Sequence, residues 1–279
     1  MMRWKAWRIA LGAVVTAGMA AVAAGKFAQG RSRYPAEVQQ LASILERLSE
    51  TNDLGTRPIH FMVVSGSYTS YLAEERGLCK EGKCRFFAQL NPYRRYGNGW
   101  NELIRQSYAF GDIQGWTFST GTIAIPQATF RAYGERTGYL ACTVAHEIAH
   151  FKRDHVFKES YHKHHNLKGY SEKDKSLEMM RFSRQQELEA DRDAADMVAR
   201  AGFSGRVCQD DIRFMHHSVG DGSATEDDST HPGYEERLAA MKQHYDAREA
   251  EPLSPVLGRP ARLSYDPEDN LLTLTPHRR

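Results

Sequence analysis

Two histidines and a glutamate within five residues are the part of the sequence with the clearest chemistry. The segment HEIAH places His146 and His150 four positions apart, so on a helix both imidazoles lie on one side and can bind one metal ion. The carboxylate of Glu147 lies beside that position, where it can act as a general base on water. Because so short a pattern also arises by chance, the elements around it must carry the argument.

The sequence around this segment predicts a buried helix. Residues 138–151 contain no proline, and apolar side chains recur there at helical spacing, namely Tyr139, Leu140, Val144, Ile148 and Phe151. The alternative is a solvated helix in which the two histidines have no role. A third metal ligand elsewhere in the sequence would argue against that alternative.

A catalytic zinc site has three protein ligands and keeps a fourth position for water. A second predicted helix, residues 183–202, supplies the third ligand. Glu187 and Asp191 are four positions apart and share one face, whereas Glu189 points nearly to the opposite side. We select Glu187 as the ligand and Asp191 as the acceptor that fixes the tautomer of a ligating histidine. For this helix taken alone, a solvated acidic face is the alternative.

The ordered combination of these motifs resembles the gluzincin zinc metallopeptidases related to HtpX, BepA and the CAAX prenyl protease. The resemblance covers about residues 59–238. One departure is the Tyr-Ala-Phe at 108–110, where relatives often have Asn-Ala-Phe, so the substrate contacts stay open. Four further positions match: His155, where relatives often carry another histidine; the strand-like segment 121–126; the Ala-Gly-Phe turn at 201–203; and Thr230-His231-Pro232 followed by Arg237.

The resemblance implies a metalloendopeptidase that cleaves misfolded or membrane-associated proteins, with one Zn²⁺ per chain held by His146, His150 and Glu187. The metal would activate water and polarise the peptide carbonyl, while Glu147 takes the water proton and returns it to the leaving amine. His231 is expected near the metal, as a donor to the oxyanion or as a removable fourth ligand that keeps the enzyme latent. A loop histidine without such a role is the alternative.

A hypothesis from another class is a non-cleaving, holdase-like binding protein that uses the same cleft. Glu147 favours the peptidase, because binding alone has no chemical need for a general base. Either protein would take proteins or peptides as partners. The formal net charge of +2 gives no reason to expect nucleic acid as a partner.

Residues 1–28 are predicted to be a signal peptide or a membrane anchor. A basic start precedes an uncharged run over 9–24, and small residues follow it, as a signal peptidase requires. As a helix this run spans about 24 Å, less than the roughly 30 Å of a hydrocarbon core, which favours cleavage over anchoring. We therefore expect export to the periplasm or to the periplasmic face of the inner membrane, with membrane association through this segment.

The four cysteines agree with an oxidising compartment. Cys79 and Cys84 flank a turn-prone tetrapeptide that can close as a disulfide hairpin, and a second metal site is the weaker alternative. Cys142 and Cys208 either pair with each other or are small buried side chains, and the sequence does not choose between these.

The remaining elements predict an α+β fold, a mostly helical zincin-type domain with a small sheet packed on the HExxH helix. We expect a catalytic domain over 31–250 and a C-terminal tail over 251–279 that forms a β-hairpin. The edge of the sheet could take an extended peptide by strand addition. The predicted elements are helices at 35–48 and 232–247, strands at 59–64, 116–118 and 122–125, and hairpin strands at 262–265 and 271–275.

Two other groups of histidines receive no role. His162, His164 and His165 lie in a polar insertion, residues 158–175, which is predicted to be a solvated loop; a second metal site is the alternative. His216 and His217 are adjacent in the chain, so at most one of them could face the zinc.

Overall fold

The computed structural model describes residues 33–276, except residues 81, 98, 204, 220–222, 252, 255, 257, 259 and 260. The predicted signal peptide or anchor over 1–28 lies outside the described residues. Within the described part of the chain, no helix combines the length and the apolar character needed to cross a membrane.

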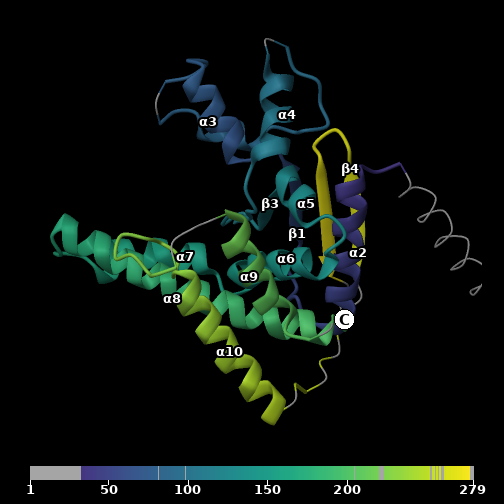
Figure 1. Ribbon diagram of the computed structural model, residues 1–279. Coiled ribbons are helices and arrows are strands. Elements are labelled where there is room, and N and C mark those ends of the chain that lie inside the picture. Colours follow the sequence, from purple (N-terminus) through teal and green to yellow (C-terminus); the bar gives the residue numbers. More distant parts are fainter. Residues whose placement is uncertain are drawn as a thin grey trace, which may run out of the picture.

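A mixed five-stranded sheet with the order β2-β3-β1-β5-β4 forms the centre of the molecule (Figure 1). The central strand β1 (Ile59–Val64) pairs in parallel with β3 (Thr122–Pro126) and antiparallel with β5 (Leu271–Pro276). The two edges are β2 (Trp116–Thr117) and β4 (Ala261–Asp266). The strands predicted over 59–64, 116–118 and 122–125 are thereby confirmed.

The C-terminal hairpin belongs to this sheet. Its two strands form where the sequence predicts them, and Leu272 and Leu274 of β5 are buried in the main core. The partner of β5 is β1, about 200 residues earlier in the chain. The hairpin strands β4 and β5 thus complete the five-stranded sheet and share the main core.

Helices enclose the sheet and build the remaining core. The predicted helix over 35–48 is confirmed as α2 (Ala36–Thr51), which packs along β4 and β5 (Figure 1). The other helices on the sheet and around the site are α5 (Gln127–Tyr133), α6 (Thr137–Lys152), α8 (Glu172–Arg200), α9 (Val207–Val219) and α10 (Tyr234–Ala250). Two more, α3 (Ser67–Glu75) and α4 (Trp100–Phe110), lie together beyond one end of the sheet, with the short helix η1 (Arg85–Gln89) between them in the chain.

The helix that carries Glu187 is longer than predicted. α8 starts at Glu172, well before residue 183, and its N-terminus is capped by Ser171, whose Oγ accepts the backbone N–H of Asp174 at 3.2 Å. The solvated loop predicted over 158–175 is wrong for most of its length, because α7 (His155–Tyr161) and the short helix η2 (His162–Asn166) fill it. Together with the first half of α8 they form an arm that extends from the body (Figure 1).

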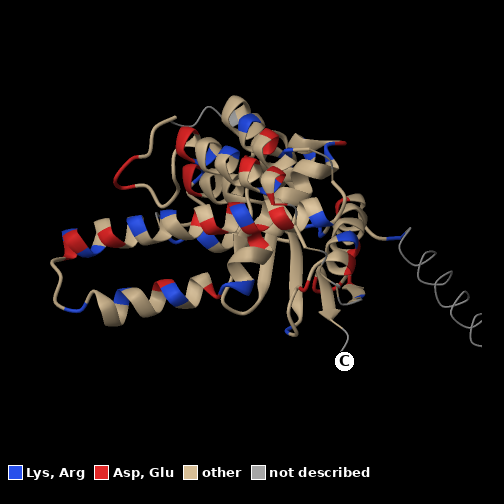
Figure 2. Ribbon diagram, turned by 90° about the horizontal axis from the view of Figure 1, so that it is seen from below, with Lys and Arg blue, Asp and Glu red and all other residues tan. Residues whose placement is uncertain are grey.

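Positively and negatively charged residues are interspersed along this arm (Figure 2). Ion pairs three residues apart connect them within α8, such as Lys175 with Glu172 at 2.8 Å and Arg181 with Glu178 at 3.7 Å. Each such pair stabilises the helix modestly, by roughly 0.2–0.5 kcal/mol.

All four cysteines form disulfides. Cys79 bonds to Cys84 in the loop after α3, as predicted. Cys142 bonds to Cys208. The sequence left open a disulfide or two separate buried cysteines, and the structure shows the disulfide. The second bond joins α6 to α9.

Candidate metal centre

The HExxH segment lies on α6, which passes through the core of the domain. Leu140, Val144 and Ile148 on this helix are fully buried, as the apolar stripe predicts. Gly138 allows α9 to come close, since a Cβ at this position would lie 2.7 Å from Cγ2 of Val207. The small-residue face of α8, with Ala190, Ala194 and Ala195 buried, lets α8 pack closely against α6. Close packing of these two helices brings the side chains of residues 146–150 to those of residues 187–191.

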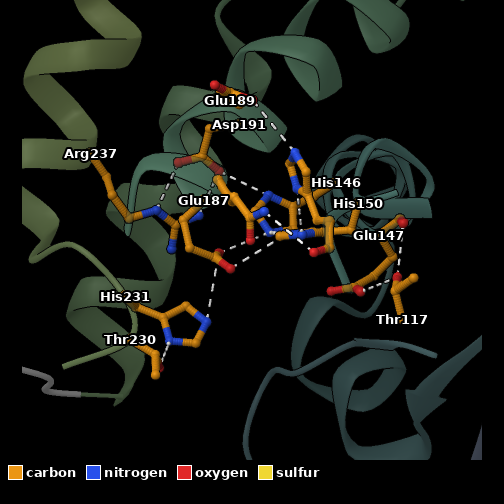
Figure 3. A network of polar contacts seen from close by, with 12 residues as sticks. Thr117, His146, Glu147, His150, Glu187, Glu189, Asp191, Thr230, His231 and Arg237 are labelled. Carbon is orange, nitrogen blue, oxygen red and sulfur yellow. Dashed lines mark hydrogen bonds and ion pairs between the residues drawn. The ribbon is translucent and has the colours of Figure 1, made fainter. Parts of the chain in front are cut away.

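The structure brings His146, His150 and Glu187 together (Figure 3). Nε2 of His146 lies 3.0 Å from Nε2 of His150 and 3.2 Å from Oε2 of Glu187. Nε2 of His150 lies 3.4 Å from Oε1 of Glu187. In tetrahedral zinc coordination with bonds of 2.0–2.1 Å, ligand atoms are about 3.3 Å apart, so the three groups match that ion's requirement.

The hydrogen bonding of His146 supports the same conclusion. Its Nδ1 lies 3.0 Å from Oδ1 of Asp191, so Nδ1 carries a proton and Nε2, which faces Glu187, is the nitrogen that can bind a cation. Burial lowers the pKa of His146, but the contacts with Asp191 and Glu187 raise it to about 10. This position therefore favours a positive charge strongly. Burial alone would raise the pKa of Glu187, but its contacts with His146 and His150 hold that pKa well below its usual range.

Asp191 lies where the sequence predicts the acceptor for a ligating histidine, and it has a second partner. Arg237 on α10 contacts it twice, with Nε 2.8 Å from Oδ2 and Nη2 2.7 Å from Oδ1. Burial opposes the charge of Asp191, but Arg237 and His146 hold its pKa well below the usual range. From the sequence, Arg237 was noted only as part of the family resemblance, five residues after Pro232, without a function.

The predicted general base, Glu147, is buried beside the metal ligands. Oγ1 of Thr117 lies 2.7 Å from its Oε2 and 2.8 Å from its backbone oxygen (Figure 3). A Cβ at Gly115 would come within 2.8 Å of Oε1 of the same carboxylate. Edge strand β2 and the residue before it therefore restrain this carboxylate. No motif in the sequence marked Gly115 or Thr117.

His231 lies at the mouth of the site. Its Nε2 is 3.6 Å from Oε2 of Glu187, and its Nδ1 is 2.9 Å from Oγ1 of Thr230 (Figure 3). The side chain is 62% exposed, unlike the three ligands. His231 is therefore next to one ligand, and most of its ring faces solvent.

His155 lies on the other side of the centre, behind His150. It is buried, its Nδ1 lies 3.0 Å from Nδ1 of His150, and its Nε2 lies 3.5 Å from Oε2 of Glu189. Burial, together with His150, lowers the pKa of His155 to about 4, so the ring is neutral at pH 7. Glu189, which the helix geometry directs away from Glu187, also accepts a hydrogen bond from Arg153 at 3.2 Å.

A cavity of about 630 Å³ extends over the site. One wall is the chain leading into β2, residues 112–116, and the opposite wall includes His231 and Tyr234. The Cys142–Cys208 disulfide lies along the same cavity. The space is large enough for several side chains of a peptide.

The other histidine groups do not form a second centre in the described part of the chain, where His146, His150 and Glu187 are the group able to share one ion. His162 instead stacks on Phe182, with ring centroids 4.3 Å apart. The second-metal alternative for residues 79–84 is wrong, because both cysteines are in a disulfide.

Comparison with known families points to the same chemistry. The model of Peptidase family M48 matches residues 169–245. This segment is less than half of the chain; it holds Glu187, Asp191 and Arg237, and the fold brings His146 and His150 to it. No curated protein and no solved structure gives a significant match. The similarity supports a metallopeptidase of the zincin type, a hydrolase that depends on a metal ion.

Proposed function

We propose that this protein is a zinc-dependent metalloendopeptidase of the cell envelope, of the HtpX and BepA type. The observation that carries the proposal is the convergence of His146, His150 and Glu187 with the buried carboxylate of Glu147 beside them. The match to Peptidase family M48 adds support, because it covers the third ligand and its helix.

Each residue of the site has its own role in the proposed reaction. Bound zinc supplies a Lewis acid that makes water acidic and polarises the scissile carbonyl. Glu147 accepts the proton from the attacking water and delivers it to the departing amine, and Thr117 holds its carboxylate in place for both transfers. Asp191, itself held by Arg237, keeps the ring of His146 directed at the ion.

The surroundings of the centre suit an extended peptide. β2 is a sheet edge whose preceding residues line the cavity, so a substrate strand can pair with it while its side chains enter the cavity. Only an unfolded or flexible segment can pair in this way, which favours misfolded or membrane-associated proteins as substrates.

The location in the cell envelope rests on the N-terminal segment and on the cysteines. Residues 1–28 have the composition of an export signal or anchor. Two disulfides are consistent with the oxidising periplasm and unusual in the cytosol.

The test is digestion of casein by the purified protein, with and without zinc, beside the Glu147→Gln variant. We expect zinc-dependent cleavage by the wild type and a rate at least about 100-fold lower for the variant, with zinc content unchanged. Equal cleavage by both proteins would remove Glu147 from the mechanism. Zinc and casein binding without cleavage by the wild type would favour the holdase-like alternative.

The ligand set has its own test, since Glu187→Gln replaces a charged ligand by a neutral amide. We expect a lower zinc content in the purified variant, measured by metal analysis. Full occupancy would place the third ligand elsewhere.

A further inference from the structure

His155 supports one of the two metal-facing imidazoles from behind. Asp154, in the left-handed conformation with φ 54°, turns the chain between α6 and α7, so that His155 returns towards His150. The side chain of His155 is 2% exposed. Its backbone oxygen accepts a hydrogen bond from Nε2 of Gln186 on α8 at 3.3 Å, which fixes the start of α7 against that helix.

Metal binding by His150 decides which ring donates and which accepts in the hydrogen bond between His150 and His155. Nε2 of His150 faces the other ligands, so the proton of its neutral ring resides on Nδ1. His150 is then the donor in the 3.0 Å contact, and Nδ1 of His155 must accept with a bare nitrogen. Because Nδ1 accepts, the ring proton of His155 resides on Nε2, which lies 3.5 Å from Oε2 of Glu189.

The two ligating histidines therefore have different partners. His146 donates to a carboxylate, Asp191, whereas His150 donates to a neutral imidazole. The carboxylate of Glu189 contacts His155 rather than His150, and it is also paired with Arg153. A neutral acceptor orients the ring of His150 without adding another negative charge next to Glu187.

We propose that His155 is a positioning residue for the metal centre, whose Nδ1 accepts the Nδ1–H of His150 while its own Nε2–H faces the carboxylate of Glu189. The inference rests on the proposed function only in taking Nε2 of His150 as a ligand atom. It requires no step of peptide hydrolysis.

Zinc affinity tests the role, measured by competition with a chromophoric chelator. His155→Leu removes the acceptor at similar volume, and we expect zinc to bind about 10–100-fold more weakly. His155→Asn places an amide oxygen where Nδ1 was, and we expect an affinity within about threefold of the wild type. His244→Leu is the matched control, because His244 is also largely buried and hydrogen-bonded, 2.7 Å from Asp196, but lies outside the centre. Wild-type affinity in His155→Leu, or equal losses in the Leu and Asn variants, would overturn the proposal.

A second measurement uses the unaltered protein and does not depend on how a variant folds. In ¹⁵N–¹H spectra of the histidine rings of the zinc-loaded protein, we expect His155 with its proton on Nε2 and His150 with its proton on Nδ1. A proton on Nδ1 of His155 contradicts the inference. If these tautomers are found but wild-type protein does not cleave casein, the peptidase proposal fails and the role of His155 stands.

Discussion

Arg237 and Asp191 form a buried ion pair with two hydrogen bonds, Nη2 to Oδ1 at 2.7 Å and Nε to Oδ2 at 2.8 Å. Oδ1 of Asp191 also accepts Nδ1–H of His146 at 3.0 Å. Three helices are thus connected in one line, from α10 through α8 to α6. The orientation of a metal ligand on α6 therefore depends on a guanidinium in the first turn of α10.

This relationship predicts the effect of Arg237→Met. The change removes the guanidinium from the buried Asp191 and leaves His146 as its remaining partner, so we expect the free energy of unfolding to fall by up to about 3–5 kcal/mol and zinc affinity to fall about 10–100-fold. Urea unfolding and chelator competition measure the two effects. The control is Arg248→Met on the same helix, which breaks an ion pair with Asp196, partly exposed and away from the centre. If both variants bind zinc like the wild type, Arg237 does not act on the site.

The raised pKa of His146 predicts a pH dependence of the zinc-free protein. The pKa is about 10 in the folded state and about 6.5 in an unfolded chain, so the charged ring stabilises the fold fully below pH 6.5. This contribution is lost as the pH rises from about 6.5 to 10. We expect the free energy of unfolding to decrease over this range with a chelator present and to change much less with zinc bound, because the ion takes the place of the proton. His146→Gln should lack the decrease, and an unchanged slope in this variant would assign it to other groups.

The contact between Thr117 and Glu147 predicts a selective loss of turnover. Thr117→Val keeps the β-branched shape but removes the hydroxyl that holds Oε2, so we expect kcat on a fluorogenic peptide to fall about tenfold. Zinc affinity should stay the same, since Thr117 contacts no ligand. The control is Thr122→Val on the adjacent strand β3, whose hydroxyl contacts Thr120. Equal kcat values in all three proteins would contradict a role for the hydroxyl.

The metal ligands could be predicted from the sequence because they lie on two helices, with two functional residues of fixed spacing on each. The spacing of His146 and His150, and of Glu187 and Asp191, fixes which side chains share a face, whatever the rest of the fold is. The apolar stripe and the small-residue face then indicate that the two helices pack together. These inferences require only helix geometry.

The residues that hold Glu147 and Asp191 could not be predicted in the same way. Thr117 and Arg237 contact these carboxylates from a strand and a helix whose positions depend on the whole fold. No spacing marks Thr117, and only the family resemblance marks Arg237. His155 was visible only as a position of family resemblance, because the turn at Asp154 that brings it back is a single left-handed residue. Likewise, the pairing of β5 with β1 depends on long-range packing, although both strands could be predicted.

The disulfide between Cys142 and Cys208 predicts a loss of stability on removal. It closes a loop of 66 residues between α6 and α9, so we expect the paired change Cys142→Ala and Cys208→Ala to lower the free energy of unfolding by about 2–4 kcal/mol. Removing Cys79 and Cys84 in the same way should cost less, because their loop spans only five residues. Urea unfolding of both double variants measures the difference. A larger loss for the short loop would contradict this order.

The position of His231 predicts a latent enzyme. Its imidazole is 3.6 Å from Glu187 and largely exposed, so it can approach the ion as a fourth ligand and can also swing away. If it occupies the place of water in the resting protein, His231→Ala should raise the basal rate of casein cleavage severalfold, with zinc content unchanged. The control is His164→Ala, an exposed histidine on the arm outside the centre. A rate that falls about 100-fold in His231→Ala would instead make this residue a donor to the oxyanion, and an unchanged rate would leave it without either role.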